Sequence, residues 1–241
     1  MSSFLPAKAF VFAAGLGTRM RPLTDRIPKP LIAVAGKPLI DHVLDRFAMA
    51  GLDTAIVNVH YLAGQIEAHL AARKAPRIVI SDEREKLLDQ GGGIAKALPL
   101  LGQEPFFLSN TDAFWIEGPG NNLGRLAASF DPERMDILLL VAATAASVGV
   151  DWPGDFNMAP DGRLTRRPER EIAPFVYTGV GIAKPGLFAR ETRDVFPLAP
   201  FFFEAAKTGR LFGQRLAGLW LHAGTPQAIE DVERTIARGV M

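Results

Sequence analysis

Apolar and polar positions follow two alternating patterns along most of this 241-residue chain. Short, mostly apolar runs are typical of buried strands, and they occupy residues 10–14, 53–60, 77–81, 105–112, 135–143 and 175–183. Longer segments carry apolar residues at helical spacing, and they occupy residues 38–51, 62–72, 122–130, 198–207 and 226–236. This alternation predicts a Rossmann-like α/β fold, in which a mostly parallel central sheet is flanked by helices.

One stretch interrupts the alternation. Residues 147–174 are rich in Gly, Pro, Asp and Arg, and Asp161-Gly162 marks a turn between short extended pieces. We therefore expect a small antiparallel insertion at this point. The length suits a single domain, whose parts we place at about 7–145, 147–184 and 185–241.

Composition narrows the classes of function. The net charge of +1 at pH 7 gives no reason to expect nucleic acid or an anionic membrane as a partner. The chain has no cysteine, which excludes disulfides, thiolate metal sites and a cysteine nucleophile. No apolar run reaches the roughly 18 residues of a membrane span, and the first residues do not have the pattern of a signal peptide. We expect a small-molecule ligand and a cytoplasmic location.

The first strand-like run leads into a glycine turn with the chemistry of a phosphate site. Gly15-Leu16-Gly17 is followed by Thr18 and Arg19. Glycine permits positive φ angles and lets a polyphosphate approach the backbone closely, where N–H groups donate to it. Arg19, Arg21 and Lys29 add positive charge nearby. The turn is therefore a candidate phosphate cradle.

Two common phosphate loops do not fit this spacing. A Walker loop would place Gly-Lys-Ser/Thr after four intervening residues, and a dinucleotide fingerprint would add a third glycine at the start of a helix. Neither pattern occurs here. Pro22, Pro28 and Pro30 instead predict an extended segment after Arg19, because proline disfavours helix at its own position and at the preceding residue. Such a loop can wrap a ligand.

The run AAGLGTRMRPLT followed by KPL resembles the signature of the sugar-1-phosphate nucleotidyltransferases. The alternative is a glycine turn with solvated charges. The resemblance implies a GT-A-like nucleotidyltransferase fold and transfer of a nucleotidyl group from an NTP to a sugar 1-phosphate, with release of pyrophosphate. It favours UTP and N-acetylmuramate 1-phosphate, a reaction of cell-wall recycling, over guanylyl transfer to mannose 1-phosphate. A nucleotide-binding sensor is the rival from another class.

The resemblance also assigns roles along the nucleotide. Arg19 and Lys29 become the catalytic cations. The residues implied to bind the nucleotide are Ala13, Ala14, Gly15, Gly17, Thr18, Glu83, Gln90, Gly91 and Gly92. The side chain of Gln90 can both donate and accept, and the glycines after it permit close backbone approach, so this stretch could read a base edge. The alternative is a flexible connector before a helix.

Two positions concern the metal. Asp112 follows a strand-like run, and Mg²⁺ often takes only one or two protein carboxylates beside phosphate oxygens and water. The family has Gly-Asp where this chain has Thr111-Asp112, and the alternative is an aspartate that caps a turn. The family's second ligand, an aspartate, is replaced by His222. His222 either binds a softer ion such as Mn²⁺, donates to a phosphate while Asp112 and water hold Mg²⁺, or marks a weakened catalyst; we favour the second.

The resemblance places the sugar phosphate against the insertion and the strand that follows it. The implied contacts are Asn110, Asp155, Asn157, Arg167, Thr178 and Gly179. The family commonly has Glu-Lys-Pro where this chain has Arg166-Arg167-Pro168, and arginine also binds phosphate well. The alternative is a solvated, charged hairpin.

Overall fold

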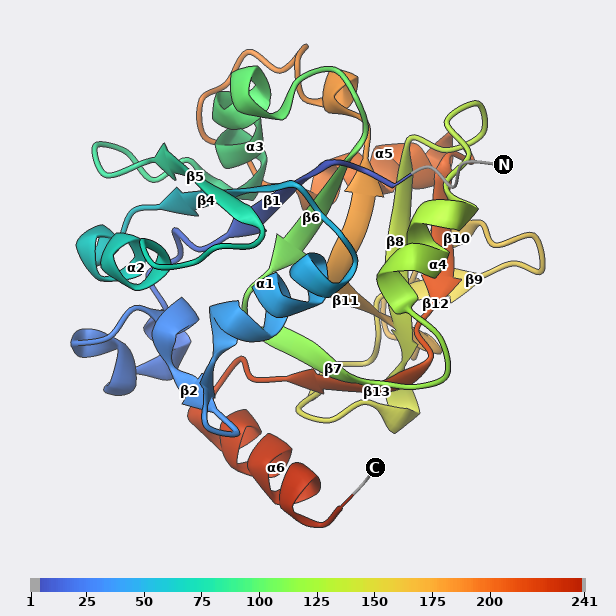
Figure 1. Ribbon diagram of the computed structural model, residues 1–241. Helices are drawn as coiled ribbons and strands as arrows, with labels where there is room; N and C mark the ends of the chain where they lie inside the picture. The colour runs from blue at the N-terminus through green and yellow to red at the C-terminus, as the bar shows by residue number, and fades with distance from the viewer. Residues whose placement is uncertain (1–4, 240–241) are drawn as a thin grey trace.

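The computed structural model describes residues 5–239, which fold around a nine-stranded mixed sheet (Figure 1). Its strands are β1 (Lys8–Phe12), β4 (Thr54–Val59), β5 (Arg77–Asp82), β6 (Phe106–Asn110), β8 (Ile137–Ala143), β9 (Phe156–Met158), β10 (Leu164–Arg166), β11 (Phe175–Ala183) and β12 (Leu211–Arg215). The main order is β10-β9-β11-β6-β1-β4-β5, and β8 pairs with β11 and β12. Strands β6, β1, β4 and β5 run parallel, whereas β11 is antiparallel to both β6 and β8. The predicted sheet is therefore confirmed.

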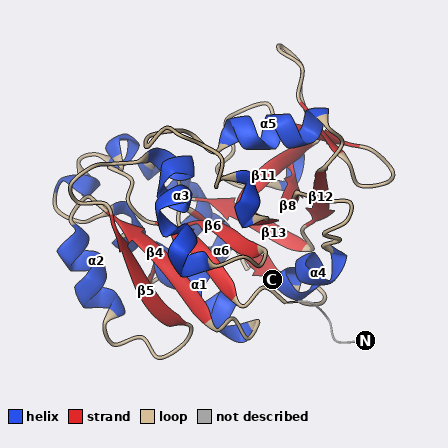
Figure 2. Ribbon diagram, turned by 90° about the horizontal axis from the view of Figure 1, so that it is seen from above, coloured by secondary structure: helices blue, strands red, loops and turns tan. Residues whose placement is uncertain are grey.

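Helices cover both faces of this sheet (Figure 2). Their bounds are α1 (Leu39–Met49), α2 (Ala63–Leu70), α3 (Asp89–Leu101), α4 (Asn122–Ser129), α5 (Ala199–Lys207) and α6 (Pro226–Ala237). Two small antiparallel pairs lie outside the main sheet, β2 (Ala33–Val34) with β3 (Lys37–Pro38) and β7 (Ala113–Glu117) with β13 (Gly218–His222). Among the described residues, no helix is long and apolar enough to cross a membrane.

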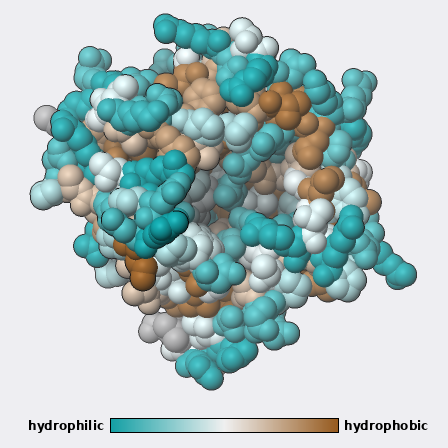
Figure 3. Space-filling view, turned by 180° about the vertical axis from the view of Figure 1, so that it is seen from behind, coloured by the Kyte–Doolittle hydropathy of each residue, from teal (hydrophilic) through white to brown (hydrophobic). Residues whose placement is uncertain are grey.

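The alternation of side chains along β1 divides the core into two layers. Ala9 and Val11 pack with α1, α2 and α4 on one face, whereas Phe10 packs with α3 and α5 on the other. All three side chains are fully buried. The surface seen from behind is mostly hydrophilic, with hydrophobic side chains in small groups and a hollow near its middle (Figure 3). β1 is thus a central strand, and its carboxyl end enters the glycine turn.

Two sequence expectations about local structure are wrong. The proline-rich segment after Arg19 is not extended but forms three short 3₁₀ helices, Thr18–Met20, Leu23–Asp25 and Lys29–Leu31. The fixed φ of proline also suits a helical first turn, and Pro30 occupies that position in the third of them. Gly91, Gly92 and Gly93, the triple glycine after Gln90, lie inside α3 rather than in a connector before it. The sequence pattern also did not predict β2 and β3, which have two residues each, or β7, β12 and β13, which have five.

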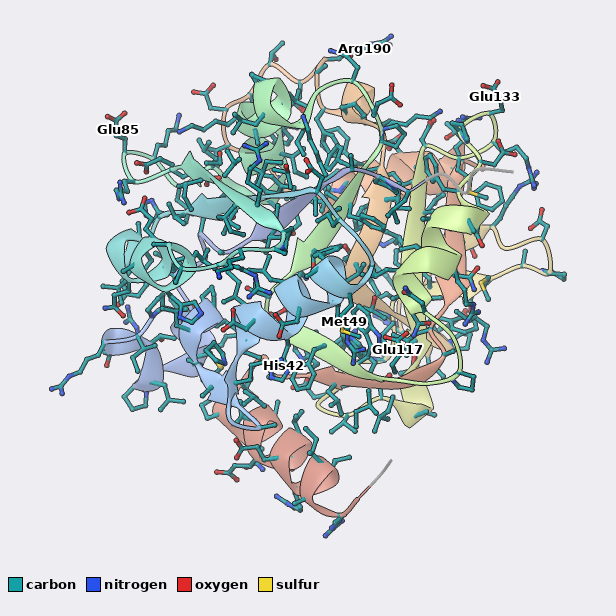
Figure 4. All side chains as sticks on the ribbon, in the orientation of Figure 1. His42, Met49, Glu85, Glu117, Glu133 and Arg190 are labelled. Atoms are coloured by element: carbon teal, nitrogen blue, oxygen red, sulfur yellow. The ribbon has the colours of Figure 1, made fainter. Side chains whose placement is uncertain are left out.

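Phe47 offers a test of the core on the α1 side. Its ring is 1% exposed and lies 5.4 Å from that of Phe107, whereas Met49, at the end of the same helix (Figure 4), is 75% exposed. Phe47→Ala should lower the free energy of unfolding by about 3–5 kcal/mol, because it leaves a cavity, and Met49→Ala should change it by less than about 0.5 kcal/mol. Urea unfolding followed by circular dichroism measures both. Equal effects would contradict this packing.

Candidate active site

A cavity of about 500 Å³ opens at the carboxyl ends of the parallel strands. It is lined by Phe12, Ala13, Ala14, Gly15, Gly17, Thr18, Arg19, Met20, Lys29, Pro30, Asn58, Glu83, Leu87, Asp89, Gln90, Asn110, Thr111, Asp112 and Val195. Eleven of these were assigned to a site from the sequence, and they come from the ends of β1, β5 and β6 and from the segments that follow those strands. Ligands bind at this position in open α/β sheets.

A buried hydrogen-bond network holds two walls of the cavity together. The amide N–H of Ala13 donates to Asn58 Oδ1 over 2.7 Å, and Asn58 Nδ2 donates to Glu83 Oε1 over 2.8 Å. The other oxygen of Glu83 accepts from the amide of Leu88 at 3.4 Å. Glu83 is 1% exposed, and burial raises the pKa of its carboxyl against the lowering effect of these hydrogen bonds. Glu83 therefore ties the two walls together, and it also lines the cavity, where its contact with the base stays a prediction.

The glycine turn has the conformation that glycine alone adopts easily. Gly17 has a φ of 64°, and a Cβ at this position would lie 2.7 Å from Thr24 Cγ2. Thr24 Oγ1 donates to the carbonyl of Gly17 over 2.8 Å, which ties the turn to the second 3₁₀ helix. A Cβ on Gly15 would meet nothing within 4 Å, so this position is open to a ligand.

Within residues 5–239, the cations on the cavity wall are Arg19 and Lys29, and their environments differ. Arg19 is exposed and has no ion pair or hydrogen bond with any residue that the structure describes. Lys29 is mostly buried, and its Nζ lies 2.8 Å from Asp112 Oδ2. Arg19 is therefore free to meet an anion at once, whereas Lys29 must exchange its partner to do so.

Asp112 lies between two cationic or potentially cationic groups. His222 Nε2 is 3.8 Å from the same Oδ2 that Lys29 contacts. Burial raises the pKa of the Asp112 carboxyl, but His222 and Lys29 lower it by more, so this pKa is held well below its usual range. Asp112 is consequently a carboxylate at any physiological pH, which is the form that binds a cation.

The imidazole of His222 is held in one orientation. Its Nδ1 lies 3.1 Å from the carbonyl oxygen of Gly149, which favours a proton on that nitrogen and directs Nε2 toward Asp112. The ring stacks on Trp220 with 5.6 Å between centroids and meets Trp152 edge-on at 5.2 Å. A Cβ on Gly224 would lie 2.2 Å from His222 Cε1, so that glycine makes room for the ring.

The donor set fits Mg²⁺ only if substrate completes it. No group of three or more His, Cys, Asp or Glu side chains that could hold a metal occurs within residues 5–239. Asp112 offers one hard carboxylate at the cavity wall, and Mg²⁺ can be held by one carboxylate with phosphate oxygens and water. The nitrogen of His222 is a poorer ligand for this ion.

Gln90 and the two glycines after it have separate surroundings. Gln90 Nε2 donates to Asn110 Oδ1 over 3.1 Å, and both side chains line the cavity. Gly91 and Gly92 do not line it, and their amides both donate to the carbonyl of Phe196. The expectation that these glycines contact the nucleotide is therefore corrected. Their N–H groups already donate within the chain, and residues 194–196 occupy the space beside them.

Of the six residues expected at the sugar phosphate, Asn110 lines the cavity, and Asp155, Asn157, Arg167, Thr178 and Gly179 do not. Asp155 accepts from Trp152 Nε1 at 3.1 Å and from the amide of Tyr177 at 2.8 Å. Burial raises the pKa of the Asp155 carboxyl, and these bonds oppose that rise. Asn157 pairs with Thr165 between β9 and β10.

Three further residues that we expected to contact the sugar phosphate have contacts within the protein instead. The guanidinium of Arg167 donates to the carbonyls of Gly154, Pro168 and Glu171. These bonds hold together the segment of residues 154–171 that contains Arg167. The hydroxyl of Thr178 is buried and donates to the carbonyl of Leu140 over 2.8 Å, away from the cavity. Gly179 has a φ of 88°, and a Cβ there would lie 2.9 Å from Asn110 Cβ; it therefore supports Asn110.

Asn58 and Val195 are among the eight lining residues that sequence reasoning did not assign to the site. Asn58 had a signal, because it is a polar residue near the end of a mostly apolar strand, β4, whose other polar residue is Thr54 at its start. Val195 had none, since it is an ordinary apolar residue in a loop far along the chain.

The comparisons with known proteins agree with this geometry. The nucleotidyl transferase family model matches residues 8–144. The N-acetylmuramate alpha-1-phosphate uridylyltransferase of Caulobacter vibrioides is 50% identical, covering 96% of this chain and 98% of that protein. The protein of the same name from Neisseria meningitidis serogroup B is 37% identical, covering 94% and 96%.

A solved structure shares the fold. A putative glucose-1-phosphate thymidylyltransferase from Bacillus anthracis superposes with a TM-score of 0.80 at 16% identity, covering 97% of this chain and 96% of that one. The family match, which spans more than half of the chain, and the strongly similar relatives show that this chain belongs to the nucleotidyl transferase family of enzymes.

Proposed function

We propose that this enzyme transfers a uridylyl group from UTP to N-acetylmuramate 1-phosphate and releases pyrophosphate. The observation that carries the proposal is the 50% identity with a uridylyltransferase of that specificity over nearly the whole chain. The cavity supports it, since a glycine turn, a free arginine and a lysine–aspartate pair lie on one wall. A cytoplasmic location is part of the same proposal, because UTP is the donor.

In the proposed reaction, an oxygen of the sugar phosphate attacks the α-phosphorus of UTP, and the bond to pyrophosphate breaks in line. The amides of Gly15 and Gly17 and the side chain of Arg19 hold the triphosphate. Lys29 moves from Asp112 to the α-phosphate and neutralises the charge that develops there. A bound Mg²⁺, or Mn²⁺ as the alternative, supplies further charge neutralisation with Asp112 as its carboxylate ligand.

Ala13, Ala14, Thr18 and Gln90 remain proposed nucleotide contacts on the cavity wall. Asn110 and Asp155 remain proposed contacts of the sugar phosphate. Asn110 has the clearer access, because it lines the cavity and is fixed by Gln90.

The substrate test measures pyrophosphate release from UTP, CTP, GTP and ATP, each with the 1-phosphates of N-acetylmuramate, N-acetylglucosamine, glucose and mannose. Turnover should be confined to UTP with N-acetylmuramate 1-phosphate. Turnover with GTP and mannose 1-phosphate would replace this assignment by guanylyl transfer. Binding of UTP without turnover of any pair would leave the nucleotide sensor.

Substitution of Lys29 tests whether its positive charge supports the transfer reaction. Lys29→Ala should lower kcat by about two to three powers of ten, because a fixed cation beside the reacting phosphate is lost. Lys37→Ala is the matched control, since Lys37 pairs with Asp45 at the surface and does not line the cavity. It should retain full turnover. A Lys29→Ala enzyme within threefold of wild type would exclude the role assigned to this lysine.

His222 tests the metal assignment. If His222 donates to a phosphate, His222→Ala should lower kcat by about tenfold or more and leave the ratio of activities in Mg²⁺ and Mn²⁺ unchanged. His69→Ala, at a surface ion pair with Asp41, is the control. A changed metal ratio, or a raised metal concentration for half-maximal activity, would instead place His222 on the ion.

A further inference from the structure

The nucleotide cavity receives one side chain from the carboxyl-terminal half of the chain. Every lining residue from Phe12 to Asp112 belongs to the amino-terminal half, and Val195 is the exception among the residues that the structure describes. The expected sugar contacts Asp155 and Thr178 do not line this cavity. Val195 therefore brings the carboxyl-terminal half to a cavity that the amino-terminal half otherwise lines.

The triple glycine of α3 fixes this contribution. We name residues 194–196 the strap. The amides of Gly91 and Gly92 donate to the strap carbonyl of Phe196 over 3.0 and 3.2 Å. A Cβ on Gly92 would lie 2.1 Å from the carbonyl oxygen of Asp194, and a Cβ on Gly91 would lie 2.4 Å from the ring of Phe196. Only a helix without side chains at these positions lets the strap lie so close.

Phe196 anchors the strap from the other side. Its ring is 1% exposed in the core beneath α3 and α5, and its amide donates to the carbonyl of Leu88 over 3.3 Å. Val195 precedes this anchor, yet its side chain is 46% exposed at the cavity. A half-exposed apolar side chain on an otherwise fixed segment is available to a ligand.

The surroundings of Val195 indicate which part of the nucleotide it meets. Phosphates require cations and N–H donors, which Arg19, Lys29 and the glycine turn supply. Val195 offers only apolar surface, as does Leu87 on the same wall. Apolar surface suits the flat face of a base or the carbons of ribose.

We propose that Val195, held by the strap on the triple glycine, is a specificity-determining residue that contacts the nucleoside of the NTP and limits the size of its base. This inference rests on the proposed uridylyl transfer and identifies a further determinant of it. The role of the triple glycine is then to position the strap.

The first experiment compares Val195 with Leu100, an apolar residue of α3 with similar exposure, 40%, that does not line the cavity. Val195→Asp should raise the KM for UTP about tenfold, because it places a carboxylate beside an anionic ligand, and the KM for N-acetylmuramate 1-phosphate should stay within twofold. Val195→Ala should lower the UTP-to-GTP ratio of kcat/KM by about fivefold. Leu100→Asp and Leu100→Ala should match wild type. An unchanged KM for UTP in Val195→Asp, or a change confined to the sugar phosphate, would overturn the proposal.

The second experiment displaces the strap by adding a side chain to α3 at the glycine that the strap packs against. Gly92→Ala should speed hydrogen exchange of peptides covering residues 190–197 and raise the KM for UTP, whereas Gly64→Ala should do neither, because a Cβ there meets nothing within 4 Å. Circular dichroism confirms that each variant is folded. Faster exchange in the strap with an unchanged KM for UTP would separate the strap from nucleotide binding and overturn the proposal.

Failure of the proposed function is distinguishable from failure of this inference. If the wild-type enzyme turns over no pair of substrates, the uridylyl transfer is wrong, and direct calorimetric titration with UTP then replaces the KM measurement. Weaker UTP binding by Val195→Asp but not by Leu100→Asp supports the contact in that case. Equal binding by both variants overturns it.

Discussion

The site depends on the side-chain amide of Asn58, which joins three segments that are far apart in the sequence. It accepts from the amide of Ala13, which leads into the glycine turn, and donates to Glu83, whose other oxygen accepts from the amide of Leu88 just before α3. The network is buried, so an unpaired group in it would cost about 1–3 kcal/mol. These hydrogen bonds tie the segments that follow β1 and β5 to β4 at the cavity.

The ion pair of Lys29 and Asp112 places two charged side chains at the cavity wall before any ligand binds. Lys29 and His222 keep the Asp112 carboxylate ionised in a place where burial alone would favour the neutral acid. A metal held together with a substrate phosphate would take Asp112 as its carboxylate ligand and would leave Lys29 for a phosphate. Little further desolvation of these two side chains would then be needed, because both are already mostly buried.

Much of the fold was readable from the sequence, because helices α1, α2 and α4 and strands β4, β6 and β8 have clear apolar periodicity. The glycine turn and Asp112 were identified as candidates because their patterns are local, and the structure places them on the cavity wall. The roles of Gly91, Thr178 and Arg167 were not, since each is decided by a partner distant in sequence: the carbonyls of Phe196 and Leu140, and the backbone of residues 154–171. Short strands such as β12 gain their stability from pairing with β8, which no local pattern encodes.

Glycine illustrates why residue type alone did not settle function. Gly17 is required for its positive φ, Gly15 for open space at the cavity, and Gly92 for close approach of another backbone. All three occur in motifs that suggest phosphate or base binding, yet the third interacts with the protein itself. The motif around α3 is therefore better understood as a joint between the two halves of the chain. Through this joint the carboxyl-terminal half reaches a cavity that the amino-terminal half otherwise builds alone, so selection of the nucleotide depends on the whole domain.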